Sequence, residues 1–198
     1  MIQTVLRLPS SLGLVLLLGC TVARAGTIAL GTWYEFSFFD PGTPAMGCAP
    51  ADPSAPDCIP SSGTGTTFAD AAPWTFAVNS PGARLTVTDV FYHGDAFDVF
   101  DSGTLIGSTA SAAAADFLSC GDDPGLCLSD PLTSKGTFLL DPSFHAISIV
   151  PNASAYGAGV GYFRVDAVPE PGTCLLVAAV LVCGVLRRYF AGNRGGAQ

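Results

Sequence analysis

Short aromatic or alternating runs of residues predict β-strands along most of the chain. In the stretch 83–92, apolar Leu85 and Val87 alternate with Thr86 and Thr88, which is the two-residue period of a strand with one buried face. Strands are predicted at residues 32–39, 74–78, 83–92, 96–100, 104–109, 136–140, 146–150 and 160–168. Many short strands of this kind are typical of an all-β fold.

The segments between these strands are rich in turn-forming residues. The Asp-Ser-Gly sequence at 101–103 predicts a tight hairpin turn, because glycine readily adopts the positive φ that such a turn needs. Residues 40–67 are expected to form a long loop, and 110–118 is the one segment expected to be helical. With 23 glycines and 15 prolines in the chain, the pattern predicts an antiparallel β-sandwich or jelly roll.

Both ends of the chain have the composition of targeting segments. Residues 1–25 contain an early cation, an apolar run over 12–19 and the small-x-small sequence 23–25, which together predict a cleaved signal peptide. A lipoprotein is the alternative, because Leu-Leu-Gly-Cys ending at Cys20 resembles a bacterial lipobox. The predicted extracytoplasmic domain is then 26–168, which is long enough for one hydrophobic core.

The C-terminal tail, residues 169–198, follows this domain directly. Two prolines at its start favour extended backbone and end the preceding strand. A transmembrane helix is predicted at 173–186, with a rise of about 20 Å against ~30 Å of hydrocarbon, and two arginines after it are expected to stay cytoplasmic. The residues that distinguish the tail are Val168, Pro169, Glu170, Pro171, Arg187 and Arg188.

In this order, the Pro-Glu-Pro sequence, the apolar helix and the arginine pair resemble the PEP-CTERM sorting signal of Gram-negative bacteria. The resemblance implies recognition and cleavage by an exosortase, a membrane protease, after transient insertion in the inner membrane. It also implies a final location at the cell surface or in the extracellular matrix, and a structural or adhesive role there beside exopolysaccharide or other envelope components, as in a biofilm. Residues 94–107 and 161–166 are similar to the ectodomains of such proteins. A permanent C-terminal anchor is the alternative.

The predicted domain is strongly acidic. Against fifteen Asp and Glu residues, 26–168 contains only Arg84, Lys135 and Arg164, for a net charge near −12. Binding to nucleic acid is excluded as a function, because it depends on cationic side chains that neutralise phosphates. An acidic surface of this kind can instead favour divalent cations.

Four cysteines fall inside the predicted domain, and outside the cytoplasm they are expected to be oxidised. Three connectivities are possible, but the closeness of the two pairs favours Cys48 with Cys58 and Cys120 with Cys127. A zinc site is the alternative, although the spacing differs from paired CxxC motifs and no histidine is adjacent.

Candidate chemistry in the domain is sparse. Asp95, Asp98 and Asp101 surround a predicted hairpin, so their carboxylates are candidate calcium ligands or, alternatively, simple turn formers. His93 and His145 are expected to be hydrogen-bonding residues rather than catalytic bases. No nucleophile elbow or phosphate-binding motif is present, and the chain is predicted not to be an enzyme.

Several aromatic residues are candidates for carbohydrate binding, because aromatic rings stack on sugar rings. The alternative is that they are core or edge residues, which need no ligand. The residues in question are Trp33, Trp74, Tyr92 and Tyr156. A calcium- or carbohydrate-binding module is thus the alternative to a structural or adhesive envelope protein.

Overall fold

The computed structural model describes residues 25–112, 114, 117–170 and 172. The predicted signal peptide up to residue 24, the alternative lipobox cysteine, Pro171, the sorting helix at 173–186 and the two arginines that follow it lie outside the described residues. Among the described residues, no helix is long and apolar enough to cross a membrane.

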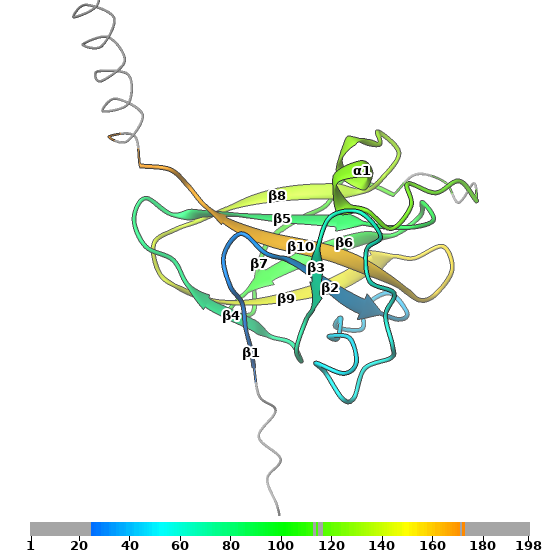
Figure 1. The fold of residues 1–198 in the computed structure, drawn as a ribbon, viewed down its shortest axis with the longest axis horizontal. Helices are drawn as coiled ribbons and strands as arrows, with labels where there is room; N and C mark the ends of the chain where they lie inside the picture. The colour runs from blue at the N-terminus through cyan, green and yellow to red at the C-terminus, as the bar shows by residue number, and fades with distance from the viewer. Residues whose placement is uncertain (1–24, 113, 115–116, 171, 173–198) are drawn as a thin grey trace, which may run out of the picture.

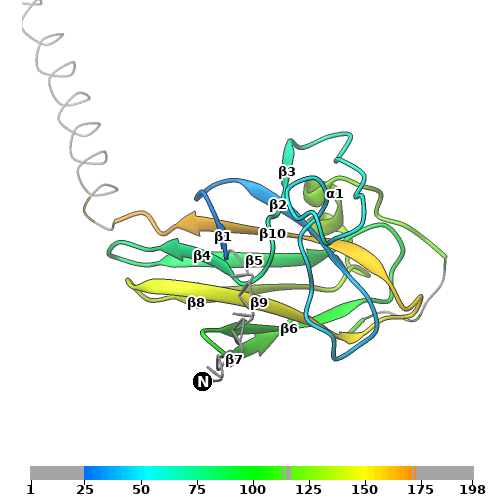
Figure 2. The ribbon, with the colours of Figure 1, turned by 90° about the horizontal axis from the view of Figure 1, so that it is seen from below.

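Two five-stranded sheets make up the described domain, and in Figure 2 β10 and β2 of one sheet lie above β9, β6 and β7 of the other. The first sheet contains, in spatial order, β1 (Gly26–Thr27), β4 (Trp74–Ala77), β9 (Phe144–Ala153), β6 (Ala96–Asp101) and β7 (Thr104–Ser108). The second contains β3 (Thr66–Phe68), β2 (Trp33–Phe38), β10 (Gly159–Ala167), β5 (Ala83–Asp89) and β8 (Lys135–Leu140). The predicted all-β fold is therefore confirmed.

The prediction of purely antiparallel sheets needs a correction. The short strands β1 and β3 both pair in parallel, β1 with β4 and β3 with β2. Both lie at a sheet edge, and both were missed in the sequence because two or three residues are too few to show alternation. The other strand pairs are antiparallel, so parallel pairing is confined to one edge of each sheet.

The predicted helix at 110–118 was wrong for the described residues in that range, none of which is helical. The amide of Ala110 donates to the carbonyl of Lys135, which holds the start of the segment against β8. At its far end Phe117 has a φ of 58°, a left-handed conformation that interrupts a right-handed helix. These backbone constraints override the helix preference of the alanines.

The helix of the domain is instead α1 (Pro124–Ser129), which covers one end of the sandwich (Figure 1). Asp123 is its N-cap, and the carboxylate accepts hydrogen bonds from the amides of Gly125 and Leu126. Proline fits the first turn because it has no amide hydrogen to leave unpaired. This capped turn is short, and the sequence pattern of apolar positions does not reveal it.

The main hydrophobic core lies between the sheets and is built on aromatic rings. Phe36 and Phe163 of one sheet pack on Trp74 and Phe97 of the other, with ring centroids 4.7 to 5.8 Å apart. Their alternate positions along each strand direct them inward, as the two-residue period requires. This core explains why the aromatic positions of the predicted strands are buried.

A second, smaller core covers the outer face of β2 and β10. Trp33, Val90, Cys127 and Tyr162 form it, so β2 is buried on both faces. Two loops provide the cover: residues 40–65, here named the first loop, and residues 119–134, which include α1 and are here named the second loop.

The two loops are bonded to each other above the sheet. Ser62 donates to the carboxylate of Asp122 through both its amide, at 3.0 Å, and its hydroxyl, at 2.7 Å. Thr64 makes the same pair of bonds to Asp123. Side chains from positions sixty residues apart thus close the cover over the second core.

Each loop contains one of the predicted disulfides. Cys48 is bonded to Cys58 in the first loop, and Cys120 to Cys127 in the second, which confirms the predicted pairing. The disulfides indicate that the chain folds in an oxidising compartment, either extracellular or periplasmic.

The chain leaves the sandwich at the end of β10. The amide of Val168 donates to the carbonyl of Gly82 at 3.0 Å, and Pro169 and Glu170 beyond it are exposed. In Figure 1 this exit lies at the end of the domain opposite α1. The last strand ends at Ala167, and the predicted boundary between domain and tail stays a prediction.

Candidate binding site

A pocket of about 450 Å³ opens at the α1 end of the sandwich, where β2 ends and β10 begins. Four segments far apart in the sequence form its walls: the end of β2, the first loop, the chain after β5, and the connection from β9 to β10. The lining includes Phe39, Ile59, Phe91, Tyr92, Asp95 and Tyr156. The walls are thus largely apolar, with few polar groups among them.

Three aromatic residues, here named the aromatic cluster, are exposed beside this pocket. Tyr92 is 51% exposed and Tyr156 is 39% exposed, and their ring centroids are 5.7 Å apart. Phe117, which is 75% exposed, lies 5.7 Å from the Tyr156 ring. The rings are tilted against one another by 55° and 50°, so they form a contiguous apolar surface that is not flat. Isolated exposed aromatics, by contrast, are common and need no function.

The backbone before the aromatic cluster has an unusual conformation. Phe91 has a φ of 61°, in the left-handed region that bulky residues rarely adopt. It is held there by Gly121, whose carbonyl accepts from its amide at 2.9 Å, and by Cys120, whose amide donates to its carbonyl at 3.1 Å. The disulfide-bonded second loop therefore fixes the turn that places Tyr92 at the mouth of the pocket.

Asp95 is the buried acidic group of the pocket. Its side chain is almost fully buried, and its Oδ1 has no hydrogen-bond partner. Burial raises the pKa of Asp95, although bonds from the Ser154 hydroxyl and the Ala155 amide partly oppose the rise. A buried oxygen without a partner is rare in native proteins, and this one belongs to a residue that lines the pocket.

Asp89 lies behind Asp95 and supports it. Its Oδ1 accepts from the amide of Val90 at 2.8 Å, and its Oδ2 accepts from the amide of Asp95 at 3.3 Å. Burial, followed by the charge of Asp95, raises the pKa of Asp89 to about 8. At neutral pH the two neighbouring carboxyls therefore hold at least one proton between them.

The structure does not bring the three candidate calcium ligands together. Asp98 accepts from Ser108 and Asn152, each at 2.6 Å, and does not share these partners with Asp95. Asp101 pairs with His145 at 2.7 Å. Among the described residues, Glu35, Cys48 and Cys58 form the one metal-sized group of His, Cys, Asp or Glu side chains, and its sulfurs are bonded to each other. A calcium site at the three aspartates stays a prediction that this geometry does not favour.

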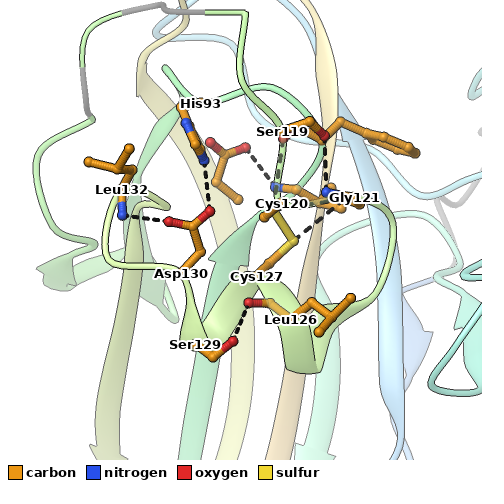
Figure 3. A network of polar contacts seen from close by, with 12 residues as sticks. His93, Ser119, Cys120, Gly121, Leu126, Cys127, Ser129, Asp130 and Leu132 are labelled. Carbon is orange, nitrogen blue, oxygen red and sulfur yellow. Dashed lines mark hydrogen bonds and ion pairs between the residues drawn. A yellow bond between two sulfur atoms is a disulfide. The ribbon is translucent and has the colours of Figure 1, made fainter.

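Both histidines have hydrogen-bonding roles, as predicted. His93 Nε2 lies 3.1 Å from Asp130 Oδ2, just beyond α1 (Figure 3). His145 Nδ1 lies 2.7 Å from Asp101 Oδ2, and its Nε2 lies 2.8 Å from the carbonyl of Asp141. His145 links β9 to the end of β6 and to the turn before β9, whereas His93 links the chain between β5 and β6 to the end of α1.

Of the four aromatic candidates for sugar binding, both tryptophans are core residues, which is the alternative that the sequence left open. Trp74 is fully buried in the main core, and Trp33 is covered by the Arg164 guanidinium, 4.8 Å from its ring centroid. Tyr92 and Tyr156, by contrast, are exposed and adjacent. Sequence alone does not distinguish these cases, because all four residues occupy strand or turn positions.

Sequence reasoning missed Glu35, which is the most unusual acidic group of the domain. It lies in the middle of β2, is fully buried, and neither of its carboxylate oxygens has a hydrogen-bond partner. Burial raises its pKa to about 7, the Ile59 amide partly opposes the rise, and the charge of Asp122 adds to it. The available signal was an acidic residue within a strongly aromatic strand, Trp-Tyr-Glu-Phe-Ser-Phe.

Together these features define a disulfide-bonded β-sandwich protein with an aromatic pocket at one end. No protein-family model, curated protein or solved structure matches the chain.

Proposed function

We propose that the chain is an exported, non-enzymatic protein of the cell surface or extracellular matrix, and that it adheres to polysaccharide through the pocket at the α1 end. The observation that carries the proposal is the pairing of exposed Tyr92 and Tyr156 beside the unpartnered Oδ1 of Asp95. The two disulfides support export, because they indicate an oxidising compartment.

The chemistry of the pocket suits a sugar ring. One face of a pyranose presents C–H groups, which pack on aromatic rings, while its hydroxyls donate hydrogen bonds. Tyr92 and Tyr156 supply the rings, and Asp95 supplies a buried acceptor that a hydroxyl would satisfy. A buried polar atom that gains a partner on binding contributes both affinity and specificity.

We further propose that the tail is a PEP-CTERM sorting signal, cut by an exosortase after the domain has crossed the inner membrane. Pro169 and Glu170 are exposed beyond the last strand, where a protease can reach an extended segment. The adhesive pocket lies at the opposite end of β10, so the membrane-proximal tail would leave it unobstructed.

The test is binding of the exported protein to exopolysaccharide prepared from the producing cells. Tyr92→Ala or Tyr156→Ala is expected to weaken binding about fivefold to tenfold, which corresponds to ~1–1.5 kcal/mol for a lost ring contact. Phe144→Ala is the matched control, because Phe144 is also exposed but starts β9 away from the pocket. If the unmodified protein and the three variants bind polysaccharide equally, the pocket is not the adhesive site.

A further inference from the structure

The buried carboxyl of Glu35 lies against the Cys48–Cys58 disulfide. A carboxylate oxygen of Glu35 and the two Sγ atoms all lie within 4.8 Å of one another. The Sγ of Cys48 is also 3.4 Å from the main-chain carbonyl oxygen of Glu35. The first loop thus places its disulfide directly over the acidic residue in the middle of β2.

The other groups around this carboxyl compensate it weakly. Neither of its oxygens has a hydrogen bond of good geometry, although the Ile59 amide is near enough to lower its pKa somewhat. No Lys or Arg among the described residues forms an ion pair with Glu35. An unpaired charge in such a site is costly, so burial favours the neutral form of the carboxyl, with its proton in place. A neutral carboxyl is a proton donor, and its nearest unexplained neighbours are the two sulfurs.

The other titratable groups around Glu35 do not compete with it as proton donors near neutral pH. Tyr162 of β10 lies opposite Glu35 of β2 in the sheet, and burial raises the pKa of Tyr162. Asp122, in the second loop, adds negative charge, as does Asp123 beside it. In the first loop, Asp52 accepts bonds from Ser54 and Gly47, and these outweigh burial and lower its pKa.

The two sulfurs of the disulfide differ in accessibility. Cys48 is fully buried, whereas Cys58 is partly exposed in the first loop. A thiolate from solution can therefore reach Cys58 but not Cys48. Attack at Cys58 makes Cys48 the leaving group, and that sulfur is the one whose negative charge would form in a buried site.

We propose that Cys48–Cys58 is a thiol–disulfide exchange site for low-molecular-mass thiols, with Glu35 as the proton donor to the buried sulfur of Cys48. The thiolate forms a new S–S bond to Cys58 Sγ, and the Cys48–Cys58 bond breaks. Its electron pair moves to Cys48 Sγ, which takes the proton of the Glu35 carboxyl and becomes a neutral thiol. A second thiolate then attacks the sulfur of the small thiol in the mixed disulfide, and Cys58 Sγ leaves as a thiolate. Solvent returns a proton to Cys58 and to Glu35, so that two small thiols are oxidised to their disulfide and the protein disulfide is reduced to two thiols.

The other disulfide is a control within the same molecule. Cys127 is fully buried and Cys120 is partly exposed, which repeats the asymmetry of the first pair. Among the described residues, however, no carboxylate oxygen forms a comparable group with these two sulfurs. Any difference in pH dependence between the two disulfides therefore reports the effect of Glu35 rather than the chemistry of the attacking thiol.

The experiment treats the oxidised full chain with reduced glutathione between pH 5.5 and 8.5, alkylates the free thiols and quantifies each disulfide by peptide mass spectrometry. Rates are divided by the glutathione thiolate concentration. For Cys48–Cys58 the corrected rate is expected to fall about tenfold as Glu35 loses its proton, while the rate for Cys120–Cys127 stays level. Glu35→Gln should remove this fall and lower the rate at pH 6 by about tenfold.

Parallel pH profiles for the two disulfides in the unmodified protein would overturn the proposal, and this comparison needs no variant. An unchanged Cys48–Cys58 rate in a folded Glu35→Gln protein would also overturn it. Neither measurement involves polysaccharide, so the exchange proposal can fail or succeed independently of the adhesive function.

Discussion

At the scale of single residues, the domain has acidic groups with opposite effects on stability. Glu35 and Asp89 have pKa values raised to about 7 and about 8, chiefly by burial. Asp101 has a lowered pKa, because bonds from His145 and the Ala146 amide outweigh the effect of its partial burial. The first two favour folding when protonated, whereas the last favours folding when ionised.

The pH dependence of stability follows from these directions. In the unfolded chain all these carboxyls titrate near pH ~4, so Glu35 and Asp89 bind protons more tightly in the folded state. Their contribution is complete below pH ~4 and is lost as pH rises through about 7 and 8. The contribution of Asp101 is present above pH ~4 and is lost as pH falls. The free energy of unfolding is therefore expected to be highest near pH 5, measured by denaturant titration from pH 3 to 9.

Glu35→Gln isolates one of these groups with little change of shape. Relative to the unmodified protein it is expected to be more stable at pH 8.5, by on the order of 2–3 kcal/mol, and nearly equal at pH 5. The fall in stability between pH 5 and 8 should become shallower. A variant with the same pH slope as the parent would show that Glu35 is not the buried group responsible.

The role of a residue was predictable from the sequence where the spacing between residues alone determined it. The disulfide pairing followed from two close cysteine pairs, since ten-residue and seven-residue separations are easily closed within a loop. Glu35 could not be anticipated, because its burial depends on loops that cover β2 from distant parts of the sequence. The same applies to Asp95, whose pocket is formed by four separate segments.

At the scale of elements, the strands with clear alternation were found and the irregular segments were not. Strands β5 and β6 lie close to the predicted 83–92 and 96–100, because each alternates between the core and its outer face. The predicted strand at 146–150 is longer in the structure, where β9 runs from Phe144 to Ala153. The helix was misplaced because α1 is defined by its cap at Asp123 rather than by an apolar period.

Asp123 contacts both α1 and the first loop, so its replacement should destabilise both. Asp123→Ala removes the N-cap of α1 and the bonds to Thr64 of the first loop. The free energy of unfolding is expected to fall by about 1–2 kcal/mol, as for other lost caps. Asp141→Ala serves as the control. Asp141 is exposed, and His145 contacts its main-chain carbonyl rather than its side chain. A loss no greater than in this control would show that the second loop is held without the cap.

At the scale of the whole molecule, the order of strands could not be predicted. Among the strands of the described residues, only β6 and β7 form a hairpin of consecutive antiparallel neighbours, and from β4 to β10 the other connections cross between sheets. Pairings such as β2 with β10 join residues more than a hundred positions apart. Alternation predicts that a strand has a buried face, but it contains no information about which distant strand lies beside it.

The proposed processing defines the mature molecule. If both targeting segments are removed, the protein should run from about residue 26 to near Pro169. Intact-mass measurement of surface and matrix fractions tests this, with Glu170→Ala as the variant expected to block cleavage and retain the tail. Recovery of only an uncut, membrane-bound chain from cells with an active exosortase would instead establish a permanent anchor.

Strand β10 connects the pocket to the exit of the tail, and this gives the domain a direction in which it can bear load. As long as the tail is uncut and holds the chain near Val168, drag on a polymer bound at the pocket would place β10 under tension along its length. Hydrogen bonds between antiparallel strands lie perpendicular to the strands, so those from β2 and β5 would resist together, in shear, rather than separate one after another. If the proposed adhesion is correct, a central strand that runs between the tail and the pocket would resist a pulling force better than an edge strand.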